Sequence, residues 1–253
     1  MTTKPVKKTS IEDHLLASLL DDSYPLWTEF ESAAPGTARH SKEVAALCKK
    51  VANKLGDIDP VLMEVLGRWH DVGKARNPKF FVENQMPGEP NIHDELDNPL
   101  YSFHIISQHV GQSTNILIHL EDLVAEDLLN LVKIISQHHG STTTKYFLSK
   151  AQEANPNLDI NTFRYYGSAP TTKEAALLMI CDVFEAKGRA AFGGKTDPPE
   201  PEEFVGALLD ELVSESQLDV LQVRDIREAR ELLIAELLSI YHDRIKYPAK
   251  EEK

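Results

Sequence analysis

The sequence is poor in cysteine: Cys48 and Cys181 are the only two among its 253 residues, and they form no CxxC pair. Both lie within apolar helical patterns, which excludes a disulfide framework and disfavours a thiolate zinc site. This usage is typical of a reducing compartment, so we expect a cytoplasmic location.

Long hydrophobic runs and an excess of positive charge are also missing. No apolar run approaches the roughly 20 residues of a membrane span, and no stretch resembles a signal peptide, so we expect no membrane contact by this chain itself. The net charge of −13 argues against binding of nucleic acid polymers. An anionic substrate would need positive charge supplied locally by metal ions or by a few Lys and Arg side chains.

Apolar residues instead recur at helical spacing along most of the chain. No stretch shows the alternation of a half-buried strand, so we predict an all-α fold. Residues 1–9 are expected to form a disordered tail, and residues 75–97, rich in Pro, Asn and Gly, a long loop. Helices are expected over about 11–20, from a turn at 34–37 to Gly56, over 60–69, from Pro99, over 125–139, after a capping box at 171–174, and over 201–214 and 223–245.

Five of the expected helices carry a side chain that could bind a metal ion at the core end of an apolar stripe. Asp182 is the hardest to explain otherwise, because a carboxylate in a core stripe is costly unless it is paired or bound to a cation. No Arg or Lys precedes it in register on the same helix face. The candidate ligands are His40, His70, Asp71, His109, His138, His139 and Asp182.

Seven ligands exceed what one metal ion can use. Two cations that share Asp71 would use all of them and leave positions open for water and substrate. Imidazole and carboxylate ligands favour iron or manganese over a structural zinc. Single members also fit structural roles: His70-Asp71 before Gly73 and Lys74 is typical of a helix C-terminus. Among the other histidines, we expect His104, His119 and His242 to be hydrogen-bonded core residues.

The chain resembles one known family. His40, His70-Asp71 with Gly73-Lys74, and Asp182 are similar to the H…HD…D pattern of HD-domain phosphohydrolases. The likeness extends to the cytoplasmic HD domain of the seven-transmembrane HD proteins, which hydrolyse cyclic di-AMP to linear pApA, and it runs from about residue 25 to residue 248. The further stretches that carry it are Ala34-Pro35-Gly36-Thr37, Glu83-Asn84-Gln85, His138-His139-Gly140, Lys173-Glu174, Glu185-Ala186 and residues 241–248.

This resemblance implies an HD-domain helical bundle over residues 34–250 with a buried dinuclear site, after a tail and short helices at 1–33. It implies two divalent metal ions, iron or manganese, and a phosphodiesterase that hydrolyses a cyclic dinucleotide through a metal-activated hydroxide. The ligand sets that it implies are His40, His70, Asp71 and Asp182 for one ion, and Asp71, His109, His138 and His139 for the other.

Asp71 and Lys74 are the expected catalytic residues, and Lys74 would also offset charge on the phosphate. Its alternative role is a cation at a helix C-terminus. Arg189, seven residues after Asp182, would meet a second phosphate or form a surface ion pair. Arg244 and Tyr247 would border the substrate or only cap and pack.

Two departures from the family leave questions open. The sequence has no transmembrane segment, so it is either a free-standing relative or a domain excised from a larger membrane protein. Residues 86–95 differ from the usual sequence of the family in this loop, so the resemblance does not indicate which base is recognised.

Three other functions remain as alternatives. Hydrolysis of cyclic di-GMP is disfavoured because no Gly-Tyr-Pro stretch follows the paired histidines. Hydrolysis of another nucleotide is possible on the same scaffold, since a fold does not fix function. A sensor that binds a cyclic dinucleotide without hydrolysing it would not need seven metal-capable groups. The sequence does not indicate an oligomeric state.

Overall fold

The computed structural model describes residues 16–242, except for 87, 97, 121–123, 194 and 196. The all-α prediction is confirmed: the described part holds helices and no strand, with one isolated bridge between Thr143 and Arg164. The α-helices are α2 (Pro25–Ala33), α3 (Pro35–Leu55), α4 (Pro60–Trp69), α5 (Ile92–Glu95), α6 (Pro99–Leu117), α7 (Ala125–Ile135), α8 (Lys145–Ala154), α9 (Lys173–Phe192), α10 (Pro201–Ser214) and α11 (Val223–His242). The 3-10 helices are η1 (Val72–Arg76), η2 (Pro78–Phe80), η3 (Val82–Asn84) and η4 (Ile160–Phe163).

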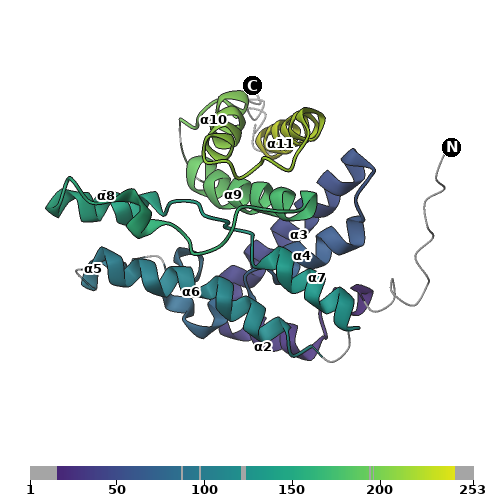
Figure 1. Cartoon of the computed structure of the whole chain (residues 1–253), viewed down its shortest axis with the longest axis horizontal. Coiled ribbons are helices and arrows are strands. Elements are labelled where there is room, and N and C mark those ends of the chain that lie inside the picture. Colours follow the sequence, from purple (N-terminus) through teal and green to yellow (C-terminus); the bar gives the residue numbers. More distant parts are fainter. Residues whose placement is uncertain are drawn as a thin grey trace, which may run out of the picture.

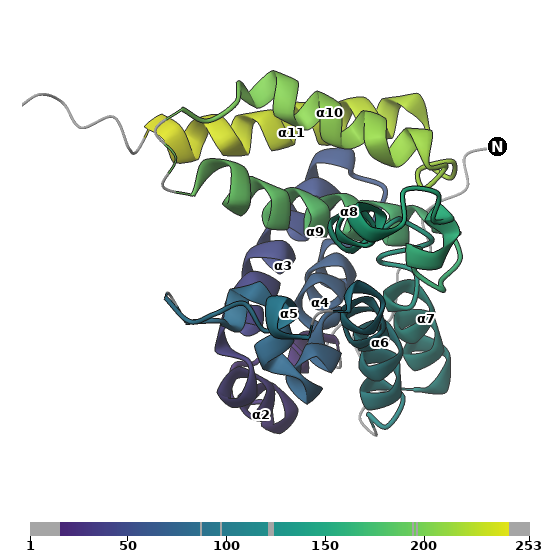
Figure 2. The ribbon, with the colours of Figure 1, turned by 90° about the vertical axis from the view of Figure 1, so that its left-hand side faces the viewer.

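The helices surround α9, which is buried along most of its length. Figure 1 shows α9 between the pair α10 and α11 on one side and α3, α4 and α7 on the other. Figure 2 shows α10 and α11 side by side across the top of this assembly, with α6 and α7 packed together below. None of the described helices is long and apolar enough to cross a lipid bilayer.

Local signals explain where several helices begin. Proline occupies the first turn of α2, α3, α4, α6 and α10, where its missing N–H costs nothing. Asp59 caps α4 by accepting from the Val61 amide at 2.8 Å, and Asn98 caps α6 by accepting from the Leu100 amide at 3.1 Å. Gly56 ends α3 in the left-handed conformation, with φ of 77°.

The turn predicted at 34–37 is wrong, because α3 already begins at Pro35. Gly36 serves a close approach of two chain segments rather than a turn, since a Cβ there would lie 1.8 Å from the Glu83 carbonyl oxygen. The early start places His40 in the second turn of α3.

Other boundaries also differ from the sequence prediction. Helix α7 ends at Ile135, so His138 and His139 lie in the turn that follows it. The loop predicted at 75–97 contains short 3-10 turns and α5, and helix α8 was missed because its apolar positions are few. The tail at 1–9 and the first half of the helix predicted over 11–20 lie outside the described residues, although Leu16 and Leu19 are buried.

The backbones of α3 and α4 meet at Gly67. A Cβ on this residue would lie 2.6 Å from the Ala45 Cα atom, so the two helices touch backbone to backbone. This approach brings the end of α4, with His70 and Asp71, beside His40 on α3.

We expect Gly67→Ala to lower the free energy of unfolding by about 1–3 kcal/mol, because the added methyl group must separate two packed helices. Gly111→Ala is the matched control: it lies on the exposed side of α6, and a Cβ added there would have nothing within 4 Å. Gly111→Ala should raise the free energy of unfolding by about 0.5–1 kcal/mol, because Ala has a higher helix propensity than Gly. Urea unfolding of both variants measures the difference, and equal stabilities would contradict the packing argument.

Candidate metal centre

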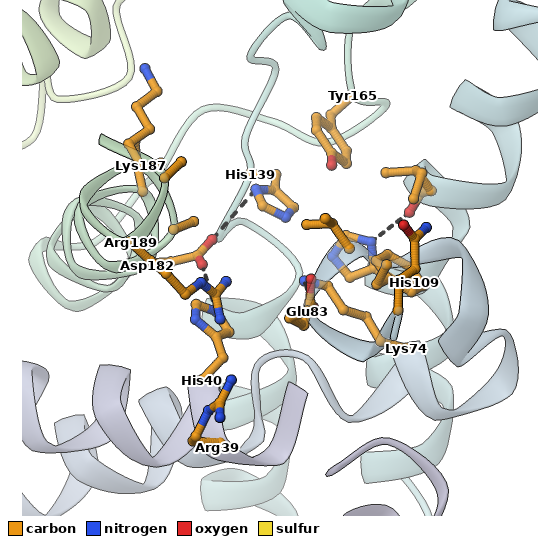
Figure 3. A pocket seen from close by; sticks show the side chains of 17 residues that line it. Arg39, His40, Lys74, Glu83, His109, His139, Tyr165, Asp182, Lys187 and Arg189 are labelled. Carbon is orange, nitrogen blue, oxygen red and sulfur yellow. Dashed lines mark hydrogen bonds and ion pairs between the residues drawn. The ribbon is translucent and has the colours of Figure 1, made fainter. Parts of the chain in front are cut away.

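The structure brings all seven candidate ligands together. Four of them, His40, His109, His139 and Asp182, line one cavity (Figure 3). The seven residues form two groups whose ligand atoms lie within 4.8 Å of one another, and Asp71 belongs to both. Group A is His40, His70, Asp71 and Asp182, and group B is Asp71, His109, His138 and His139.

Helices α3, α4, α6 and α9 and the turn after α7 each deliver part of the centre. Gly73, two residues after Asp71, is required for one of these approaches. A Cβ on Gly73 would lie 2.3 Å from the carbonyl oxygen of His109, and its amide donates to the Ser113 hydroxyl at 2.9 Å. The glycine therefore lets η1 pack directly on the backbone of α6, which holds His109 next to Asp71.

Group A places two imidazoles against two carboxylates. The Nε2 atom of His40 lies 3.1 Å from Asp182 Oδ1 and 3.5 Å from Asp71 Oδ2. The Nε2 atom of His70 lies 3.2 Å from Asp71 Oδ2 and 3.5 Å from Asp182 Oδ1. Both imidazoles thus face the same pair of oxygens.

Group B lies on the other oxygen of Asp71. His109 Nε2 is 3.3 Å and His138 Nε2 is 3.7 Å from Asp71 Oδ1. The two Nε2 atoms are 3.2 Å from each other. His139 completes the group and also approaches group A, with its Nδ1 atom 3.7 Å from Asp182 Oδ2.

The hydrogen bonds of three imidazoles fix which nitrogen faces the centre with a lone pair. The Nδ1 atoms of His70, His109 and His138 contact backbone carbonyls three residues back, at 2.8, 2.5 and 2.6 Å. A carbonyl only accepts, so each Nδ1 carries a proton, and Nε2 is the nitrogen through which each of these imidazoles can bind a metal ion.

Unprotonated Nε2 atoms would face one another and the carboxylates across the centre, an arrangement that repels unless a cation lies between them. His70 Nε2 and Asp71 Oδ1 are buried without a hydrogen-bond partner. Such groups are rare in native proteins without a bound ion or water. The donor set, with its imidazoles and its shared carboxylate, fits divalent metal ions.

The negative charge of the centre is concentrated on group A. Burial opposes ionisation of Asp71 and Asp182, but neighbouring histidines hold the pKa of both carboxyls well below the usual range. Burial alone would lower the pKa of His70, yet Asp71 and Asp182 raise it to about 10, so a proton on its Nε2 atom occupies the place of a cation when no metal ion is bound. In group B, burial outweighs the single carboxylate and lowers the pKa of His109 to about 3.

Lys74 lies between the centre and the wall of the cavity. Its Nζ atom is 2.7 Å from Asp71 Oδ2 and 3.0 Å from Glu83 Oε1. Burial would lower the pKa of Lys74, but these carboxylates raise it above its ordinary value, so the ammonium stays charged. The pairing with Glu83 was missed in the sequence, because residues nine apart across 3-10 turns share no regular register.

The cavity above the centre has a volume of about 610 Å³ and is bordered by several cations. Arg39, Lys187 and Arg189 line it together with Lys74 (Figure 3). Arg189 is one third exposed, and its Nη2 atom lies 3.6 Å from Glu185 Oε2. The acidic chain therefore presents positive side chains around this opening.

Tyr165 forms part of the cavity wall beside the paired histidines. Its ring stacks on His139, with centroids 4.4 Å apart and planes inclined by 22°. Tyr166 is 74% exposed, and its hydroxyl contacts His104 Nδ1 at 3.3 Å. The neighbouring tyrosines therefore differ in position, and only Tyr165 lies against a candidate ligand.

Some sequence expectations fail or fall outside the described residues. His104 and His119 are exposed rather than buried, because α6 and the turn after it point these positions away from the core. Arg244, Tyr247 and the His242 side chain lie outside the residues that the structure describes.

The sequence is similar to known proteins along most of its length. The sequence is 36% identical over 239 residues to the cyclic-di-AMP phosphodiesterase PgpH of Listeria monocytogenes, and 32% identical over 240 residues to PgpH of Bacillus subtilis. These alignments cover 92% and 94% of this chain but 31% and 32% of the relatives, so the chain spans about a third of their length.

The fold is similar to that of solved HD domains. The crystal structure of the L. monocytogenes PgpH HD domain in complex with cyclic di-AMP matches with a TM-score of 0.76 and 36% identity, over 88% of this chain and all of that one. A second structure of that HD domain matches with a TM-score of 0.75. The family model for the HD domain matches residues 37–187. This chain belongs to the HD domain family.

Proposed function

We propose that this protein is a metal-dependent phosphodiesterase that hydrolyses cyclic di-AMP to linear pApA. The observation that carries the proposal is the pair of ligand groups joined by Asp71 beneath a cavity bordered by cations. The similarity to an HD domain in complex with cyclic di-AMP, over the full length of that domain, supports the choice of substrate. The HD unit would extend over residues 34–250, and its place would be the cytoplasm.

We assign two divalent ions, iron or manganese, to the centre. His40, His70, Asp71 and Asp182 would hold one ion, and Asp71, His109, His138 and His139 would hold the other. When bound, such a pair supplies a hydroxide nucleophile at neutral pH and neutralises charge on the phosphate. The mixture of imidazole and carboxylate ligands supports iron or manganese.

The chain's own residues would bind and orient the substrate. Asp71 fixes the spacing of the two groups, because its two oxygens face different sets of imidazoles. Lys74, charged and beside Asp71, would offset negative charge on the scissile phosphate. Arg189 at the cavity border would meet the second phosphate of the dinucleotide. Arg244 and Tyr247 stay sequence predictions for the substrate border.

We expect the wild-type protein with Mn²⁺ to convert cyclic di-AMP to pApA, and Asp71→Asn to lower this activity at least about 100-fold. The neutral amide cannot bridge the two ligand groups as the carboxylate does. Mutation of a residue that only hydrogen-bonds to a metal ligand typically lowers activity 10- to 100-fold, so loss of a ligand itself should lower it further. Asp210→Asn, an exposed position on α10, is the matched control and should retain full activity. Chromatography of the products measures both.

The same assay separates the alternative substrates. Faster turnover of cyclic di-GMP than of cyclic di-AMP would overturn the assigned base. Equal turnover of cyclic di-AMP by wild type and Asp71→Asn would overturn the assigned centre.

We expect the metal-free protein to bind two Mn²⁺ ions per chain and to gain thermal stability from them. A ligand at 100 times its dissociation constant stabilises the native state by about 2.7 kcal/mol. Elemental analysis gives the stoichiometry, and a thermal scan with and without Mn²⁺ gives the shift. A protein that binds cyclic di-AMP but neither Mn²⁺ nor Fe²⁺ would instead be a sensor that does not hydrolyse it.

A further inference from the structure

His40 is held differently from the imidazoles that use backbone carbonyls. Its Nδ1 atom contacts the carboxylate of Glu185, while its Nε2 atom faces Asp182 Oδ1 at 3.1 Å. His70, His109 and His138 each use a carbonyl three residues earlier in the chain. Among these four imidazoles, His40 is thus the one whose Nδ1 atom, which points away from the centre, contacts a carboxylate, that of Glu185.

The spacing of Asp182 and Glu185 explains how one helix reaches both nitrogens. Residues three apart lie on the same face of a helix, one turn from each other. Helix α9 therefore brackets the His40 ring of α3 between two carboxylates. The His40 side chain is 2% exposed and that of Glu185 is 10% exposed, so water does not replace either contact.

Two further charged groups surround Glu185. Arg189, one turn later on α9, approaches its Oε2 atom at 3.6 Å. Glu43, an exposed residue on α3, lies near Glu185; partial desolvation and this neighbouring carboxylate raise the pKa of Glu43. Besides its contact with His40, the Glu185 carboxylate is therefore flanked by one cation and one further carboxyl group.

We propose that Glu185 is a positioning residue for the metal centre: it accepts the Nδ1 proton of His40 and so presents the Nε2 lone pair of His40 to the ion shared with Asp182. The carboxylate also makes the imidazole a stronger donor than a carbonyl partner would, as carboxylate–histidine–metal arrangements do. This inference rests on the proposed metal centre and adds a residue that touches neither metal nor substrate.

The test is a titration of the metal-free protein with Mn²⁺. Calorimetry measures the heat of binding, and the electron paramagnetic resonance signal of free Mn²⁺ measures how much metal remains unbound. We expect Glu185→Ala to weaken one of two binding steps by about 10- to 100-fold and to leave the other within about threefold. Glu185→Gln keeps an oxygen that can accept from Nδ1 but loses the charge, so its effect should fall between that of Glu185→Ala and wild type.

Glu43→Gln is the matched control, because it replaces another carboxyl beside Glu185 by an amide and leaves the contact between Glu185 and His40 in place. It should bind both ions within about threefold of wild type. Far-ultraviolet circular dichroism of each metal-free variant checks folding, and Glu185→Gln alone decides the question if Glu185→Ala is unfolded.

The outcomes separate this inference from the proposed function. Two Mn²⁺ ions bound by wild type, with unchanged affinities in Glu185→Gln and in any folded Glu185→Ala, would overturn the role of Glu185 and leave the centre standing. An equal loss in Glu43→Gln and Glu185→Gln would also overturn it, since the effect would not pass through His40. No Mn²⁺ binding by wild type would overturn the metal centre itself.

Discussion

The shared carboxylate of Asp71 is the constraint on which the rest of the structure depends. One of its oxygens faces His40, His70 and Lys74; the other faces His109 and His138 and has no hydrogen-bond partner among the described residues. A buried carboxylate in this state is stable only with compensating positive charge. Lys74 supplies one positive charge next to Asp71. The surrounding imidazoles and the second buried carboxylate, Asp182, favour metal cations as the source of the additional positive charge.

Close backbone contacts are what allow four helices and a turn to converge on this carboxylate. Gly67 lets α4 touch α3, and Gly73 lets η1 touch α6, in both cases at distances that no Cβ would permit. Close packing of the backbones therefore assembles the centre, because it brings the Cα atoms of the candidate ligands near enough for their side chains to meet. Helix α9 then closes it from the opposite side with Asp182 and Glu185.

The sequence predicts the helical class, the positions of most long helices and the seven side chains that lie together. Periodicity identifies these features because a ligand at the end of an apolar stripe is carried into the core with it. Periodicity does not identify α8, whose buried face is small, or the start of α3, where Pro35 and Gly36 have the composition of a turn. It also cannot pair Lys74 with Glu83 or His40 with Glu185, because those contacts depend on how separate segments pack.

The cations around the cavity have a consequence for how an anion would reach it. The chain as a whole carries a charge of −13, so its far field repels an anion that the cations at the opening attract. At an ionic strength of 0.15 M the Debye length is about 8 Å. Salt therefore screens the long-range repulsion between the chain and an anion more than it screens the short-range attraction of that anion to Arg39 or Arg189. Capture would thus be a short-range event that gains from moderate ionic strength, the reverse of long-range steering by a basic surface.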